Sequence, residues 1–123
     1  MANLSNIKIK YFNKNITSII ISEPKTYNAL SFKNLKDLIK AFKKLDNDKN
    51  VKVIIIEGSG KGFSAGHNLK EVRDLKIRIK YQKLFNLCSK LMLQIVEGKK
   101  PVIAKVHGAA FAAGCQLVAS CDL

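Results

Sequence analysis

The chain has 123 residues, of which 47% are hydrophobic and 25% charged, and these proportions are ordinary for one soluble globular domain. No apolar run approaches the roughly 20 residues that span a bilayer, and no compact apolar segment marks a secretory signal, so we expect a cytoplasmic protein, with mitochondria as the alternative. The formal net charge of +13 favours anionic ligands, but the lysines are spread along the chain without interleaved aromatics, so we expect neither nucleic acid nor a membrane as partner.

Alternating or β-branched apolar runs predict four strands, at 7–12, 16–22, 51–57 and 102–106. Three helices are expected between and after them. In 31–46, apolar residues recur at spacings of three and four behind Ser31, which is a suitable N-cap. A third helix is expected to begin near Gly114, and 121–123 has the character of a strand entry.

The second helix is expected at 76–97, where Gly98 ends it before Pro101. Its apolar stripe contains Ile77, Tyr81, Leu84, Phe85, Cys88, Leu91, Met92 and Ile95. Strands that alternate with helices through glycine-containing turns predict an α/β domain with parallel pairing.

The three cysteines, Cys88, Cys115 and Cys121, do not form a Cys-x-x-Cys pair or a zinc-ligand spacing. We expect them to be reduced thiols in the core, and we expect no metal site.

Two turns follow strands 51–57 and 102–106 and contain many small residues, so a ligand could approach the backbone there. They are equally compatible with being tight turns without a ligand. The first turn does not match a phosphate-binding loop, because Lys61 follows Gly58 and Gly60 at the wrong spacing. It also lacks the third glycine of a dinucleotide-binding fingerprint, since position 63 is phenylalanine.

Characteristic segments stand in a fixed order along the chain: 24–30 (PKTYNAL), 63–71 (FSAGHNLKE), 101–108 (PVIAKVHG), 113–117 (AGCQL) and 121–123 (CDL). In this order they resemble the signatures of the crotonase superfamily (enoyl-CoA hydratase/isomerase). Within it, the chain looks most like the enoyl-CoA hydratase domain-containing proteins whose second turn reads AGCQL.

The resemblance implies a fold and an extent. The chain would be the N-terminal part of a crotonase-like (ClpP/crotonase) spiral of repeated strand-strand-helix units. Residues 1–123 would form one acyl-CoA-binding core, about half of the family domain, so we expect a truncated protein. The family suggests a homotrimer or hexamer, but the region used for assembly would be missing.

The resemblance also implies the chemistry. Family members bind acyl-CoA thioesters, often in fatty-acid metabolism, and polarise the thioester carbonyl with two backbone N–H groups, here those of His67 and Ala113. Such donors stabilise the enolate oxygen of the transition state. No cofactor is expected, since CoA is part of the substrate. Carried over by motif position, the expected CoA-binding residues are Lys25, Asn28, Ala65, Gly66, Asn68, Leu69, Lys70 and Gly114.

The sequence departs from the hydratase pattern in its proton-transfer groups. Gln116 occupies the position of a catalytic glutamate, and an amide has no pKa suited to proton transfer. The second glutamate of hydratases would fall beyond Leu123. The second turn also has Ala112-Ala113 where the family often has two glycines, and a Cβ there restricts φ.

These departures leave several hypotheses open. The chain is either an acyl-CoA enzyme, catalysing hydration, isomerisation or thioester hydrolysis, or a catalytically silent module that binds acyl-CoA or a related subunit. A basic nucleic-acid-binding protein is a third hypothesis, which depends on charge alone.

Overall fold

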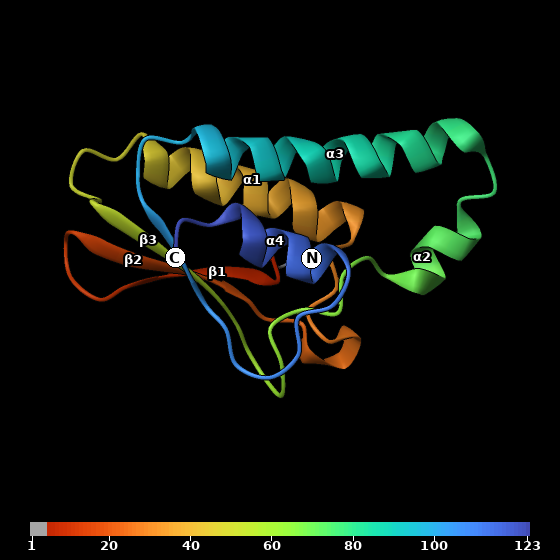
Figure 1. Ribbon diagram of the computed structural model, residues 1–123, viewed down its shortest axis with the longest axis horizontal. Helices are drawn as coiled ribbons and strands as arrows, with labels where there is room; N and C mark the ends of the chain where they lie inside the picture. The colour runs from red at the N-terminus through yellow and green to blue at the C-terminus, as the bar shows by residue number, and fades with distance from the viewer. Residues whose placement is uncertain (1–4) are drawn as a thin grey trace.

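The computed structural model describes residues 5–123 as a four-stranded sheet with helices packed against one face (Figure 1). The strands are β1 (Ile7–Tyr11), β2 (Ile16–Ile21), β3 (Val53–Gly58) and β4 (Val102–Lys105). They lie in the order β1-β2-β3-β4, with β1 antiparallel to β2 and the other pairs parallel. The α/β class and the parallel pairing predicted from the sequence are confirmed.

The main helices are α1 (Phe32–Asp46), α3 (Arg78–Glu97) and α4 (Ala113–Ser120). Figure 1 shows α1 and α3 side by side above the sheet and α4 below α1 in this view. Ser31 caps α1 as predicted, because its hydroxyl oxygen accepts a hydrogen bond from Asn34 N at 3.1 Å.

The core lies between the helices and the face of the sheet that they cover. Alternate residues of β2 and β3 point toward the helices, as the two-residue period of a strand requires. Fully or almost fully buried side chains come from all these elements: Ile19, Ile21, Ile54, Ile56, Leu35, Leu38, Leu45, Leu84, Leu91 and Leu117.

Two short helical segments were not predicted. They are α2 (Leu69–Asp74) and the 3-10 turn η1 (Pro24–Thr26). Both lie in segments for which the sequence predicts neither a strand nor a helix, and α2 extends away from the body of the domain (Figure 1).

Helix α3 begins two residues later than predicted, because Lys76 takes a left-handed conformation with φ 59°. Ile77 is therefore the N-cap and is 53% exposed instead of lying on the buried stripe. Phe85 is also misassigned, since 46% of it is exposed. The strand entry predicted at 121–123 is supported by backbone hydrogen bonds: Asp122 N donates to Val102 O at 2.9 Å, and Ala104 N to Leu123 O at 2.7 Å.

All three cysteines are free, but only Cys88 is a core thiol as predicted. Cys121 is half-buried, and Cys115 is exposed because it lies on the outer side of α4 while Gly114 and Leu117 face inward. Burial raises the pKa of Cys88, and burial together with the Asp122 carboxylate raises the pKa of Cys121 to about 11. Within residues 5–123, no helix is long and apolar enough to cross a membrane.

Candidate functional site

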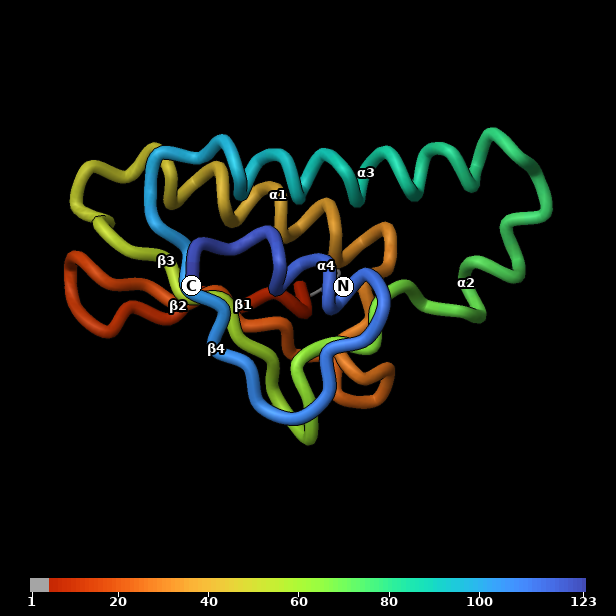
Figure 2. Tube along the Cα trace, in the orientation of Figure 1, coloured from red at the N-terminus to blue at the C-terminus, as the bar shows by residue number. Residues whose placement is uncertain are grey.

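The turns that follow β3 and β4 lie side by side at the carboxyl ends of these strands (Figure 2). Ser64 and Ala110 form an isolated parallel β-bridge. Phe63 N donates to Ala109 O at 2.9 Å, and Phe111 N donates to Ser64 O at 3.0 Å. The backbone of each turn is thus held in register by the other.

Glycines allow the two turns to approach more closely than side chains would permit. Gly66 has φ 91°, and a Cβ built on it would lie 3.1 Å from Ala113 N. A Cβ on Gly114 would lie only 2.4 Å from Ser64 O, a distance that no real contact tolerates. These two positions therefore require glycine for close packing.

The two predicted donors, His67 N and Ala113 N, lie on these turns. Among residues 5–123, neither group has a hydrogen-bond acceptor. Ala113 is only 7% exposed and is the first residue of α4, so its N–H belongs to the partly positive amino end of that helix. An oxygen that carries negative charge would satisfy the unused N–H group of Ala113 and the dipole of α4.

A third segment, which contains Asn28, fastens the first turn in place. The Asn28 side-chain amide donates to Ser59 O at 2.7 Å and to Gly62 O and Phe63 O at 3.1 Å each, while its oxygen accepts from Glu23 N at 2.9 Å. Asn28 is 0% exposed. Asn28 nevertheless lines one of the cavities beside these turns, so its CoA-binding role stays a prediction, and its hydrogen bonds add the role of supporting the first turn.

Two adjoining cavities lie along these segments, with volumes of about 300 Å³ and 450 Å³. Tyr27, Lys61 and Gly62 line both of them. Ala65 and Phe111 line only the smaller, mostly apolar cavity. Sequence reasoning missed Tyr27, Lys61 and Phe111 as cavity-lining residues, although all three lie within or beside the recognised motifs.

The other predicted CoA-binding residues are divided between the cavities and α2. Lys25 is exposed and lines the larger cavity, whereas Lys70 is exposed on α2 and lines neither cavity. Asn68 uses its side chain to cap α2, accepting from Glu71 N at 3.1 Å. Leu69 is 80% exposed at the start of the same helix.

The side chains of the two histidines form hydrogen bonds with backbone carbonyl groups. The Nδ1 atom of His67 lies 3.3 Å from Leu30 O, and its ring packs edge-on against Phe85 with centroids 5.3 Å apart. His107 Nε2 lies 2.7 Å from Gly60 O. Both histidines therefore join segments of the fold, which fits a backbone role for His67.

Gln116 lies in the first turn of α4, exposed to solvent. Its backbone N donates to Ala112 O at 3.0 Å, and its side chain has no partner within residues 5–123. The amide is thus free to orient a ligand or a water molecule, but it has no acid or base chemistry.

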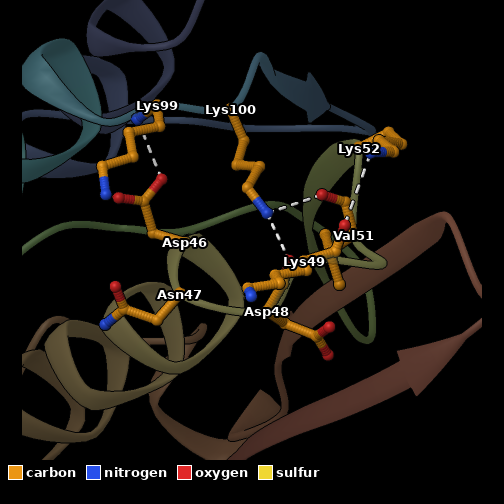
Figure 3. Close-up of a pocket in the computed structure, with 8 residues that line it drawn as sticks. All are labelled: Asp46, Asn47, Asp48, Lys49, Val51, Lys52, Lys99 and Lys100. Carbon is orange, nitrogen blue, oxygen red and sulfur yellow. Dashed lines mark hydrogen bonds between the residues drawn. The ribbon is translucent and has the colours of Figure 1, made fainter.

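A larger cavity of about 590 Å³ lies at the opposite ends of β3 and β4, beside the carboxyl end of α1 (Figure 3). Lysines surround it, and Lys100 and Asp46 use their side chains in contacts with the backbone. Lys100 Nζ donates to Val51 O at 2.6 Å and to Leu45 O at 3.3 Å, and Lys99 N donates to Asp46 Oδ1 at 2.8 Å. These contacts cap the end of α1, so this cavity is a structural junction.

Comparison with known proteins identifies the family to which the chain belongs. A profile of the enoyl-CoA hydratase/isomerase family matches residues 11–123. The human enoyl-CoA hydratase domain-containing protein 3, mitochondrial, is 46% identical over 108 residues, which are 88% of this chain and 36% of that protein. The short-chain-enoyl-CoA hydratase of Clostridium acetobutylicum is 32% identical over 121 residues, 98% of this chain and 46% of that protein.

Solved structures agree. The human domain-containing protein 3 superposes with a TM-score of 0.90 and 42% identity, covering 96% of this chain and 46% of that one. An enoyl-CoA hydratase of Mycobacterium smegmatis gives a TM-score of 0.93 and 42% identity, covering 98% of this chain and 47% of that one. The resemblance to the crotonase superfamily and the crotonase-like fold are thereby confirmed.

Two further points follow from these relatives. The chain spans about a third of the length of the vertebrate relatives that it matches, 36–37% of each. The cytoplasmic location expected from the sequence is wrong, because the relatives from human, mouse and Xenopus laevis, 44–46% identical, are named as mitochondrial proteins. The names of these relatives point to a mitochondrial location, which the composition and hydropathy of the chain do not reveal.

Proposed function

Because the chain belongs to the enoyl-CoA hydratase/isomerase family, we propose that it binds acyl-CoA thioesters of fatty-acid metabolism and polarises their carbonyl group. The N–H groups of His67 and Ala113 hold the thioester oxygen. The observation that supports this proposal is the pair of unused backbone donors on two turns that are fastened together at the carboxyl ends of parallel strands. Donors fixed in this way stabilise developing enolate charge, and the loss of one such donor typically lowers a rate by about 10²–10³-fold.

The remainder of the ligand extends over the two adjoining cavities. The mostly apolar cavity beside Ala65 and Phe111 suits the uncharged part of the CoA arm, and the larger cavity beside Lys25 suits its phosphates. Lys70, exposed on α2, offers a second cation for phosphate. Asn28, Asn68 and the glycines shape the backbone that the ligand approaches.

Proton transfer distinguishes two versions of this function. With a glutamate at position 116, a hydratase could move a proton to or from water, but Gln116 can only orient water. One version is an enzyme that uses bound water for hydration, isomerisation or hydrolysis. The alternative is a silent module that binds acyl-CoA without converting it, and the exposed amide of Gln116 favours this alternative.

The test is a titration of the 123-residue chain with crotonyl-CoA, following the heat of binding and the enoyl-thioester absorbance in the same sample. Binding without loss of absorbance supports the silent module, and steady loss supports the enzyme. The Gln116→Glu variant provides the matched comparison, since it restores a carboxylate without changing the fold. If the folded chain releases no heat with crotonyl-CoA, acyl-CoA binding is refuted.

A further inference from the structure

Ala112 has an unusual backbone conformation directly before the proposed donor Ala113. Its φ is 50° and its ψ is −121°. Tyr27, also at positive φ, has ψ 44° and lies in the ordinary left-handed helical region. The ψ value of Ala112 places it outside that region, in a part of φ/ψ space that a residue with a Cβ rarely occupies.

The local chain path explains why this conformation occurs. The second turn stays paired with the first as far as Phe111, whose N donates to Ser64 O at 3.0 Å. Helix α4 begins at Ala113, only two residues later. Ala112 alone must therefore redirect the chain from an extended path into a helix.

The conformation of Ala112 also determines where the Ala113 N–H points. Ala112 O accepts a hydrogen bond from Gln116 N at 3.0 Å, so this carbonyl points into the first turn of α4. The C=O and N–H of a trans peptide point in opposite directions. The Ala113 N–H therefore points out of the amino end of α4, where Gly66 approaches so closely that a Cβ on it would lie 3.1 Å from Ala113 N.

We propose that Ala112 is a positioning residue: its strained backbone aims the Ala113 N–H at the ligand carbonyl, and its methyl group weakens this arrangement relative to glycine. The inference rests on the proposed function, because it assigns the Ala113 N–H to a thioester oxygen. The residue type at position 112 thus sets how firmly the second donor is held. Glycine at position 112 holds the Ala113 N–H in place without backbone strain, and alanine does so with strain. A β-branched residue would hold it poorly, because its side chain restricts the backbone further.

The test compares Ala112→Gly and Ala112→Val with the wild-type chain. Ala119→Gly is the matched control, since Ala119 is exposed within α4, away from the two turns. Three quantities are measured: the thermal midpoint, the affinity for butyryl-CoA, and the infrared carbonyl frequency of butyryl-CoA labelled with ¹³C at the thioester. Butyryl-CoA has no double bond, so hydration does not interfere.

We expect Ala112→Gly to raise the thermal midpoint by about 3–8 °C, since it removes backbone strain, and to keep the full carbonyl shift. Ala119→Gly should lower the midpoint and leave the carbonyl shift unchanged. Ala112→Val should bind at least tenfold more weakly, with a smaller carbonyl shift in the fraction that is bound. A purely structural residue would change the midpoint without changing the carbonyl frequency.

Two results would overturn the inference: a midpoint of Ala112→Gly below that of the wild type, or a folded Ala112→Val variant with the wild-type carbonyl shift. If Ala112→Val does not fold, the affinity of the glycine variant decides: tighter binding of butyryl-CoA than by the wild type supports the inference, and equal or weaker binding, or a smaller carbonyl shift, refutes it. Absence of butyryl-CoA binding by the wild-type chain would instead refute the proposed function, and the positioning role with it. Binding by the wild type with no difference among the variants refutes only the role of Ala112.

Discussion

Replacing Asn28 by alanine should destabilise the fold more than any comparable change of an exposed asparagine. The side chain is fully buried, and it makes four hydrogen bonds to the backbone at Glu23, Ser59, Gly62 and Phe63. The bond to Phe63 O is buried, so its loss leaves this carbonyl oxygen without a hydrogen-bond partner and without access to water. The other three bonds are only partly buried, so water can replace the lost partner there.

The magnitude follows from these contacts. With roughly 1–3 kcal/mol for the stranded carbonyl and about 1 kcal/mol or less for each remaining bond, the loss is about 3–5 kcal/mol. Alanine also accepts the left-handed conformation of this position, φ 54°, less readily than asparagine does. A domain of this size is stable by only about 5–15 kcal/mol, so the variant should be close to unfolding.

Urea unfolding followed by far-ultraviolet circular dichroism measures this loss, which corresponds to a midpoint lower by about 2 M. Asn86→Ala is the control, because Asn86 is exposed on α3, and its stability should stay within about 0.5 kcal/mol of the wild type. Asn28→Asp should be at least as unstable as Asn28→Ala, since it turns a carboxylate toward three carbonyl oxygens. A stable Asn28→Asp, or an Asn28→Ala within about 1 kcal/mol of the wild type, would refute the supporting role of this side chain.

Four further experiments have defined outcomes. Thr17→Val should raise the free energy of unfolding by about 1 kcal/mol in urea titrations, because the Thr17 hydroxyl is buried without a partner. Gly114→Ala should lower it by more than about 2 kcal/mol in the same assay, because its Cβ would collide with Ser64 O. A thiol reagent at pH 8 should modify exposed Cys115 first and Cys121 hardly at all, as mass spectrometry would show. Since the folded pKa of Cys121 is raised to about 11, its contribution to stability should be lost as pH rises from about 9 to 11.

The regular elements were predictable because their periodicity is strong. The strands alternate apolar residues in a sheet covered on one face, and the stripe of α1 begins directly behind the Ser31 cap. Helix α2 was missed because six residues give no periodicity, although Asn68 followed three positions later by Glu71 is an N-cap signal that could have found it.

The roles of individual side chains were harder to predict than their positions in the motifs. The motifs bring Asn28 and the two turns together, but only the hydrogen bonds reveal that the Asn28 side chain holds the backbone of the first turn. Lys61 and Phe111 face the cavities because of how the turns are paired, which depends on contacts between segments distant in the sequence. The sequence indicates that a Cβ at position 112 restricts φ, but only the structure shows that Ala112 has a positive φ of 50°.

The central claim is that the backbone N–H groups of His67 and Ala113 polarise a thioester carbonyl. Isotope-edited infrared spectroscopy of the wild-type chain with ¹³C-carbonyl butyryl-CoA tests it most directly. We expect the carbonyl stretch of the bound thioester to fall below its frequency in water, because two fixed donors at a helix terminus polarise the bond more than solvent does. A bound thioester whose carbonyl frequency equals or exceeds the value in water would contradict the account.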